Sequence, residues 1–516
     1  MNRAKNLDQL EKEQQWDVAI IGGGASGLGI ALDSASRGHK TILLEKNDFA
    51  KGTSSRSTKL VHGGVRYLQN GDISLVIEAL RERGIMRKNA PHLVRDLSFV
   101  IPSYDWWSSP FYGIGLKVYD MMAGKLGLGP STILNREETL KYLPNVKKEG
   151  LRGGVIYHDG QFDDARMAVS LALTADQEGA TLLNYVEVTG LEKEKDMLTG
   201  IQITDCIDGS KKTIKAKVVV NATGVFSDQI IRMDQPEAKP MIRHSQGVHL
   251  VIDKSFLQGD HAIMVPHTTD GRVLFAVPWN GQVVVGTTDT PIDDALEEPI
   301  PMEEEIDFIL ENASAYMTKK PHRKDVKSVF VGLRPLAATN NNKESTKEVS
   351  RHHKIIVSTS GLVSVLGGKW TTYRKMAEDA VNTIQMVGGF QDRKCTTETL
   401  PILGNDFNVD FTNPYHFYGT EAPKIKALNP EKANQSLSEK LFISENQVLW
   451  AVQEEMAMTL EDVLARRTRC LFLDAYETEK IAPEVAKIMS KVLKKDAQWI
   501  EKELEKFSLI LKKYQL

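Results

Sequence analysis

Hydrophobic and polar positions near the N-terminus predict a strand, a tight turn, a helix and a second strand. The apolar run Trp16–Ile21 precedes three glycines in the pattern Gly22-x-Gly24-x-x-Gly27, and a second apolar run ends at Glu45. Glycines at this spacing permit the turn, the close approach of a phosphate and the packing of the helix on the strand. The segment is therefore predicted to form a βαβ unit that binds a dinucleotide, with Glu45 accepting hydrogen bonds from ribose hydroxyls.

The rest of the pattern predicts one early helix, short strands in the middle and helices at the end. Strand-like runs separated by turn residues are typical of an antiparallel sheet, which we expect to form a second domain. A buried run at 215–222 is expected to return to the first sheet. The other predicted elements are a helix at 74–94, strands at 249–252, 273–277, 282–285, 354–357 and 362–366, and helices at 459–469 and 487–511.

For two segments, the sequence does not decide whether the apolar residues pack inside the protein or face a membrane, a cavity or a partner. Residues 101–129 are rich in aromatic residues and glycine. Buried packing is favoured there, with a membrane-facing or cavity-lining surface as the alternative. Residues 487–511 carry apolar positions at mixed three- and four-residue spacing, which predicts an amphipathic helix. We expect it to pack on its own domain, and a membrane or partner surface is the alternative.

Length, charge and cysteine content narrow the class of protein. A chain of 516 residues is too long for one core, so two or three domains are expected. The net charge of −3 gives no general attraction to nucleic acid. Cys206, Cys395 and Cys470 lie far apart, without metal-binding spacing, which fits a reducing cytoplasm and predicts no metal site. The sequence shows neither a signal peptide nor the roughly 20 apolar residues of a membrane span, so any membrane contact is expected to be peripheral.

Three further segments favour FAD over NAD as the dinucleotide. Residues 53–67 are dense in hydroxyls and glycines, which suits a loop and helix start along a cofactor. A serine-rich surface loop is the alternative. Residues 218–224 are predicted as a late strand of the first sheet. Residues 364–373 place Gly-Gly before a helix, whose positive end would stabilise the negative charge of a reduced flavin. A nicotinamide needs no such second helix start.

Five strings taken together resemble a known flavoprotein family. In chain order they are STKLVHGGVRYL, NATGVFSD, GTTD, GLRPL and GGKWTTYRKMAEDA. They are similar to strings of the FAD-dependent glycerol-3-phosphate dehydrogenases, in the D-amino-acid-oxidase-like superfamily. Residues 462–469 resemble the family's C-terminal helical domain, so the resemblance covers nearly the whole chain. Related oxidases usually carry a central insertion. The segment between Gly286 and Arg334 leaves no room for one, which favours a dehydrogenase.

The resemblance implies an α/β fold, an activity and partners. A discontinuous Rossmann-like FAD domain is expected to carry an inserted antiparallel β-sheet substrate domain and an all-helical C-terminal domain. The implied activity is oxidation of sn-glycerol 3-phosphate to dihydroxyacetone phosphate, with hydride transfer from C2 to flavin N5 and electrons passed to a membrane quinone. A cytoplasmic location, peripheral on the inner face of the cell membrane, is expected, and a homodimer is left open. The expected ranges are 1–90, 150–240 and 354–400 for the FAD domain, 91–149 and 241–353 for the substrate domain, and 401–516 for the C-terminal domain.

The reaction implied by the resemblance points to residues for the substrate phosphate and the cofactor. A phosphate dianion needs cations and donors, expected from Arg66, Tyr67, Arg351 and Lys369. The cofactor is expected to contact Gly22, Gly24, Gly27, Glu45, Ser54, Ser55, Ser57, Leu60, His62, Gly63, Ala222, Thr223, Gly224, Gly368, Lys369 and Thr371.

Removal of the hydroxyl proton needs an acceptor near the flavin. His62 and His249 are the candidates, because imidazole titrates near neutral pH, and the sequence does not choose between them. His62 is also a candidate for flavin contact. Arg334 is expected to stabilise the developing charge on the substrate oxygen.

Three other functions stay open. An oxidase would differ only in passing electrons to oxygen. A relative that oxidises an amine or amino acid would bind a carboxylate and need fewer cations than a phosphate does. A flavin-binding protein with a structural or regulatory role would not need Arg66, Arg334 and Lys369 to converge.

Overall fold

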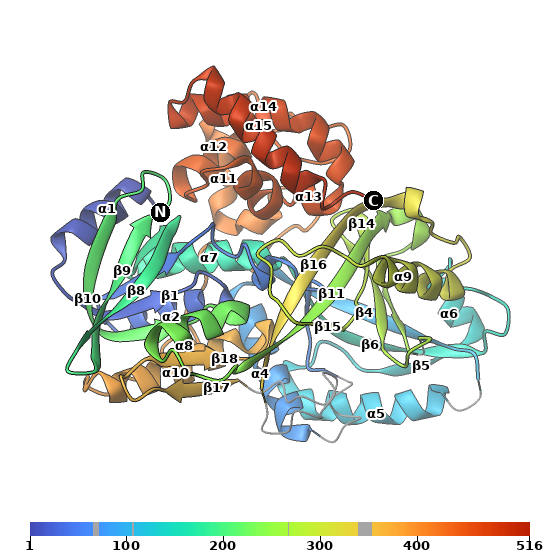
Figure 1. Cartoon of the computed structure of the whole chain (residues 1–516). Coiled ribbons are helices and arrows are strands. Elements are labelled where there is room, and N and C mark those ends of the chain that lie inside the picture. The colour runs from blue at the N-terminus through green and yellow to red at the C-terminus, as the bar shows by residue number, and fades with distance from the viewer. Residues whose placement is uncertain (65–71, 106–107, 267, 339–352) are drawn as a thin grey trace.

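The computed structural model describes residues 1–64, 72–105, 108–266, 268–338 and 353–516, which build two sheets and a helical layer. The sheets lie side by side, and the C-terminal helices α11 to α15, within residues 422–511, lie across their upper edge (Figure 1). Within the described residues, no helix combines the length and the apolar character needed to cross a bilayer.

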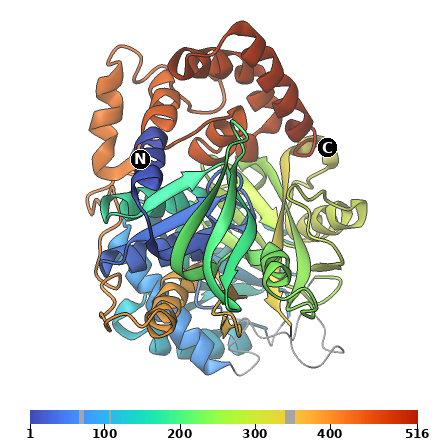
Figure 2. The same ribbon diagram turned by 60° about the vertical axis from the view of Figure 1, so that its left-hand side comes forward.

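The first sheet confirms the predicted βαβ unit and the late strand that returns to it. β1 pairs in parallel with β2 on one side and with β10 on the other, and β10 pairs in parallel with β18. β8 and β9 form a hairpin that continues from β10, and α1 lies beside it (Figure 2). The strands are β17 (Lys354–Val357), β18 (Val363–Leu366), β10 (Lys211–Asn221), β1 (Trp16–Ile21), β2 (Thr41–Glu45), β7 (Thr181–Asn184), β8 (Val186–Glu194) and β9 (Met197–Asp205).

One helix layer covers the core of the first sheet. α2 packs between α7 and α10. Their apolar side chains share a core cluster with Val18, Ile20 and Val220 of the strands. The helices around this sheet are α1 (Arg3–Lys12), α2 (Ala25–Ser36), α7 (Asp164–Gln177), α8 (Ser227–Asp234) and α10 (Tyr373–Val387).

The second sheet is largely antiparallel, as predicted. The expected central strands are neighbours in the order β11, β14, β13, while β12 and β4 form a parallel pair. Its strands are β3 (Leu60–Val61), β4 (Val94–Ser103), β5 (Thr132–Asn135), β6 (Gly153–Phe162), β11 (Ile242–Asp253), β12 (Ala262–Val265), β13 (Leu274–Trp279), β14 (Gln282–Gly286), β15 (Thr290–Ile292) and β16 (Val326–Ala337). Helices α4 (Ile73–Asn89), α5 (Ser108–Ala123), α6 (Arg136–Tyr142) and α9 (Glu303–Tyr316) flank it.

The two faces of the second sheet have different neighbours. Leu250, Val285 and Val329 point toward a core shared with α9. Val251 and Phe330, on the opposite face, join the core of the C-terminal helices. The domain ranges stay a prediction, although β3 and β6 belong to the second sheet while lying in segments expected to form the FAD domain.

The C-terminal layer differs from the sequence expectation at two breaks. The helix expected at 459–469 is a π-helical turn, Asp462–Arg467, followed by Arg469 in the left-handed region. The single helix expected at 487–511 is two helices, because Lys494 is left-handed and Asp496 caps a new start at the Trp499 amide. The helices are α11 (Ala422–Leu428), α12 (Glu445–Glu454), α13 (Cys470–Leu473), α14 (Ala475–Leu493) and α15 (Ala497–Leu511). Phe507 and Leu511 of α15 are buried, so this helix packs on its own domain as predicted.

Candidate active site

Two adjoining cavities lie between the first sheet and one face of the second. The larger, about 520 Å³, is lined by the glycine turn after β1, the end of β2 and the loop that follows it. The smaller, about 210 Å³, is lined by residues of β11 and β16. Gly367, Gly368 and Lys369 line both cavities, so a single ligand can extend from one into the other.

The glycine turn has the geometry that a pyrophosphate needs. Gly22 has a φ of +109°, and a Cβ there would lie 2.7 Å from the carbonyl oxygen of Ala222. A Cβ on Gly27 would collide with the Gly22 carbonyl oxygen, so glycine lets α2 pack against the turn. The first residues of α2 line the larger cavity, where Ser54 Oγ accepts from the Ala25 amide at 2.9 Å. Free amides at a helix start are an anion site.

Glu45 occupies the place expected for a ribose ligand. Its carboxylate accepts from the Gly23 amide at 2.6 Å and the Asn47 amide at 2.8 Å, and it lines the larger cavity. Burial raises the pKa of Glu45, while these two hydrogen bonds act in the opposite direction. The turn, the helix start and Glu45 together fit the adenosine and pyrophosphate part of FAD.

The smaller cavity brings together the three predicted catalytic residues and one of the candidates for phosphate binding. His62, His249, Arg334 and Lys369 all line it. Arg334 donates to the carbonyl oxygens of Gln246 and Thr288 and pairs with Asp289 at 3.2 Å. These contacts hold the guanidinium at the cavity wall. Cationic and imidazole groups are thus placed beside the predicted flavin end of the larger cavity.

Glycines of the second sheet make room for these side chains. A Cβ on Gly247 would lie 2.6 Å from a terminal nitrogen of Arg334, and one on Gly286 would collide with the His249 ring. Gly332 lies under Arg56, whose carbonyl oxygen would be 2.7 Å from a Cβ there. Glycine on one face of three neighbouring strands therefore creates the floor of the site.

His249 is buried and held in a fixed orientation. Its ring stacks on Phe330 with centroids 4.8 Å apart, and Nε2 lies 2.9 Å from the Thr58 hydroxyl. Burial, followed by the positive charges of Lys59 and Arg334, holds the pKa of His249 well below its usual value. The imidazole is therefore neutral at neutral pH, the state in which it can accept a proton.

The segment that carries His62 is held by α5. The Tyr119 hydroxyl accepts from the Gly63 amide at 2.8 Å and donates to Asp159 at 2.7 Å. Asp159 also pairs with Arg83 at 2.7 Å. A buried polar network thus fixes the chain next to His62.

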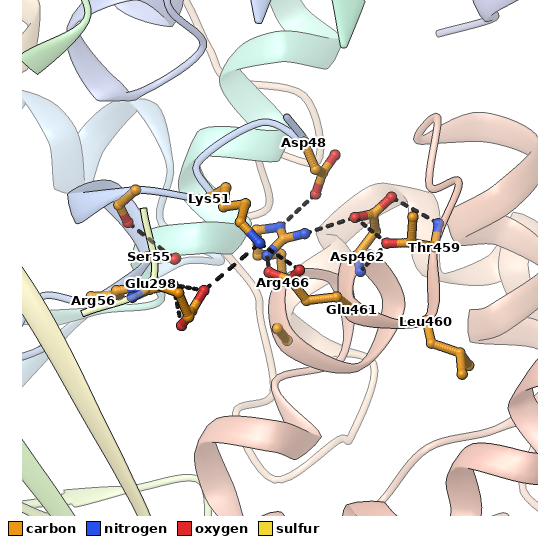
Figure 3. Close-up of polar contacts among 12 residues, drawn as sticks. Asp48, Lys51, Ser55, Arg56, Glu298, Thr459, Leu460, Glu461, Asp462 and Arg466 are labelled. Carbon is orange, nitrogen blue, oxygen red and sulfur yellow. Dashed lines mark hydrogen bonds and ion pairs between the residues drawn. The ribbon is translucent and has the colours of Figure 1, made fainter. Parts of the chain in front are cut away.

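The loop along the larger cavity is tied to the C-terminal layer by buried ion pairs (Figure 3). Asp48 accepts from Arg466 Nε at 2.6 Å and from Arg467 at 2.7 and 2.8 Å. Lys51 donates to Glu461 at 2.5 Å. Although burial acts to raise it, Arg467 and Arg466 hold the pKa of Asp48 well below its usual range. The helical layer therefore helps to shape the cavity wall.

Most of the predicted cofactor residues lie at the two cavities. Gly22, Gly24, Glu45, Ser54, Ala222, Thr223, Gly224, Gly368 and Lys369 line the larger one, and Ser57, Leu60, His62, Lys369 and Thr371 line the smaller. Gly27 packs beneath the turn, Ser55 is buried with its hydroxyl toward the Gly52 carbonyl, and Gly63 bonds Tyr119. Three phosphate-binding candidates, Arg66, Tyr67 and Arg351, lie outside the described residues.

Several cavity residues were missed by the sequence prediction. Thr53 and Thr58 lie inside the hydroxyl-rich segment but were not singled out, although the density of hydroxyls there was the available signal. Residues 295–297 line the larger cavity from a loop after β15 and belong to no motif.

Comparison with known proteins agrees with this geometry. A family described as FAD dependent oxidoreductase matches residues 17–374, and one described as C-terminal domain of alpha-glycerophosphate oxidase matches residues 395–500. A probable mitochondrial glycerol-3-phosphate dehydrogenase of Dictyostelium discoideum is 40% identical, over 99% of this chain and 86% of its own. The mitochondrial glycerol-3-phosphate dehydrogenase of Rattus norvegicus is 38% identical, over 98% of this chain and 74% of its own.

A solved structure extends the likeness to three dimensions. The glycerol-3-phosphate dehydrogenase from Bacillus halodurans, complexed with FAD, superposes with a TM-score of 0.79 at 29% identity, covering 99% of this chain and 97% of that one. The fold is that of an oxidoreductase that binds FAD. Within that class, the chain belongs to the FAD-dependent glycerol-3-phosphate dehydrogenases.

Proposed function

We propose that the protein oxidises sn-glycerol 3-phosphate to dihydroxyacetone phosphate and passes the electrons to a quinone in the membrane. The observation that carries the substrate assignment is the gathering of Arg334, Lys369 and two histidines at the small cavity, beside the cavity that fits FAD. Bound FAD supplies the acceptor for the hydride that leaves C2 of the substrate.

The protein's own residues orient the substrate and take its proton. Lys369 offers a point charge to the phosphate dianion. Arg334, fixed by backbone oxygens and Asp289, stabilises negative charge that develops on the C2 oxygen. We propose His249 as the base, because its ring lines the small cavity and is fixed there by stacking on Phe330 and by Thr58 at Nε2. His62, at the same cavity, remains the alternative base or a flavin contact.

Delivery to a membrane quinone needs a surface that meets lipid. Helix α5 is apolar on two sides: Tyr112, Leu116 and Tyr119 are buried, as predicted for this aromatic segment. Phe111, Ile114 and Met121 are instead 63%, 68% and 75% exposed. Exposed apolar side chains gathered on one helix mark an interaction surface. We propose that this side of α5 attaches the protein peripherally to a bilayer.

The experiment uses the holoenzyme with lipid vesicles that contain a long-chain quinone. The variant Ile114→Ser with Met121→Ser should bind these vesicles at least about tenfold more weakly, since each buried apolar side chain contributes roughly 1.5 kcal/mol or more. Its turnover with a water-soluble dye should be unchanged. Leu509→Ser, at a side chain 63% exposed on α15, is the matched control and should bind like wild type.

Two results would count against this account. Equal vesicle binding by the double variant and the control would remove α5 as the membrane surface. Reoxidation by air as fast as by the quinone would make the protein an oxidase, whichever surface binds lipid.

A further inference from the structure

The His249 ring has one hydrogen-bond partner among the described residues, and it comes from a different segment of the chain. Thr58 Oγ1 lies 2.9 Å from Nε2, and both residues line the small cavity. Nδ1 is closed to solvent and has no hydrogen-bond partner in the described part of the chain. A proton from a ligand in the cavity must therefore enter at Nε2, the nitrogen that Thr58 contacts.

Thr58 is held in place by the residues on either side of it. The Ser57 amide and hydroxyl both donate to Asp164 Oδ2, at 3.0 and 2.7 Å. Lys59 Nζ donates to both oxygens of the same carboxylate, at 2.9 and 2.7 Å. Ser57 and Lys59 thus both bind the carboxylate of Asp164 at the start of α7. These contacts fix the backbone on either side of Thr58, whose side chain contacts His249.

This anchor is buried and fixed from several sides. Asp164 and Lys59 have no exposed side-chain surface, and Arg469 from the C-terminal layer donates to Asp164 at 2.6 Å. Lys59 has a φ of +64°. A left-handed conformation is unfavourable for a non-glycine residue, so the surrounding contacts must hold it.

Lys59 also contacts Phe330, the residue on which the His249 ring stacks. Lys59 Nζ lies over the Phe330 ring, 5.0 Å from its centroid, and His249 stacks on Phe330. The Lys59–Asp164 pair is therefore connected to His249 twice, once through Thr58 and once through Phe330.

We propose that Thr58 is a positioning residue for His249, held on Asp164 by Ser57 and Lys59. The proposal rests on the role of His249 as base. A threonine hydroxyl both donates and accepts. Before substrate binds, it donates to the lone pair of Nε2. When the substrate hydroxyl takes the place of that donor and passes its proton to the ring, Thr58 Oγ1 accepts from the Nε2–H that forms, so the charged ring keeps a partner.

The test compares three holoenzyme variants by anaerobic stopped-flow reduction of the flavin with sn-glycerol 3-phosphate. Thr58→Val keeps the branched shape and removes the hydroxyl, and it should slow reduction at saturating substrate about tenfold, the loss of one hydrogen bond in the transition state. Thr58→Ser restores the hydroxyl and should come within about twofold of wild type. His249→Asn should be slower than either. The visible spectrum of the bound flavin and the substrate concentration at half-maximal rate should not change in the Thr58 variants.

The outcomes separate this inference from the proposed function. If Thr58→Val reduces at the wild-type rate while His249→Asn is slow, the positioning role fails and the base stands. If Thr58→Ser is as slow as Thr58→Val, the hydroxyl is not the cause and the inference is wrong. If His249→Asn reduces at the wild-type rate, the proposed base is wrong, and the role of Thr58 falls with it.

Discussion

At the scale of single residues, the glycine turn makes a sharp steric prediction. Gly27→Ala places a methyl group against the Gly22 carbonyl oxygen, which cannot move without disturbing β1 or α2. We expect loss of bound FAD and a lower midpoint of thermal unfolding, measured on the purified variant by its visible spectrum and by calorimetry.

A second glycine supplies the control for that prediction. At Gly115, inside α5, a methyl group would have no atom of the described residues within 4 Å outside its own helix backbone and its chain neighbours. Gly115→Ala should therefore leave FAD content unchanged and stabilise its helix by up to about 1 kcal/mol. Equal FAD content in the two variants would contradict the steric account of the turn.

The sequence could predict those single residues whose type and spacing are required by the geometry of the bound cofactor. Gly22, Gly27 and Glu45 lie where their spacing placed them, because phosphate and ribose geometry dictates that spacing. Thr58 carries no such signature. It matters because folding brings it beside His249, 191 positions away in sequence, and periodicity does not report contacts at that range.

At the scale of elements, periodicity predicted strands well and helix ends poorly. The bounds of β1 and β17 match the prediction, since each is a short apolar run bounded by polar or turn residues. The break between α14 and α15 was missed because apolar spacing continues across it. Its determinants are the left-handed backbone of Lys494 and the side chain of Asp496, which caps the Trp499 amide, and neither changes the apolar spacing.

At the scale of the whole molecule, the ion pairs of Asp48 join the N-terminal domain to the C-terminal layer. Asp48→Asn takes the shared carboxylate from Arg466 and Arg467, which stay buried. We expect the free energy of unfolding to fall by about 3 kcal/mol, the lower end of the range for breaking a buried ion pair. The lower end applies because Arg466 retains its ion pair with Glu461. Urea unfolding followed by tryptophan fluorescence measures this change.

An exposed pair gives the matched control. Asp260 pairs with Lys254 at 2.8 Å, with side chains 87% and 47% exposed. Asp260→Asn should change the free energy of unfolding by no more than about 1 kcal/mol. If Asp48→Asn were no more destabilising than Asp260→Asn, the ion pairs of Asp48 would not stabilise the contact between the N-terminal domain and the C-terminal layer.

We propose above that this site oxidises a phosphorylated alcohol with bound FAD. The most direct measurement is the visible spectrum of the anaerobic holoenzyme after addition of sn-glycerol 3-phosphate, compared with glycerol and with sarcosine. We expect the flavin band to bleach with sn-glycerol 3-phosphate alone, because Arg334 and Lys369 face a dianion that the other two compounds lack. Bleaching by sarcosine, or no bleaching by sn-glycerol 3-phosphate, would contradict the claim.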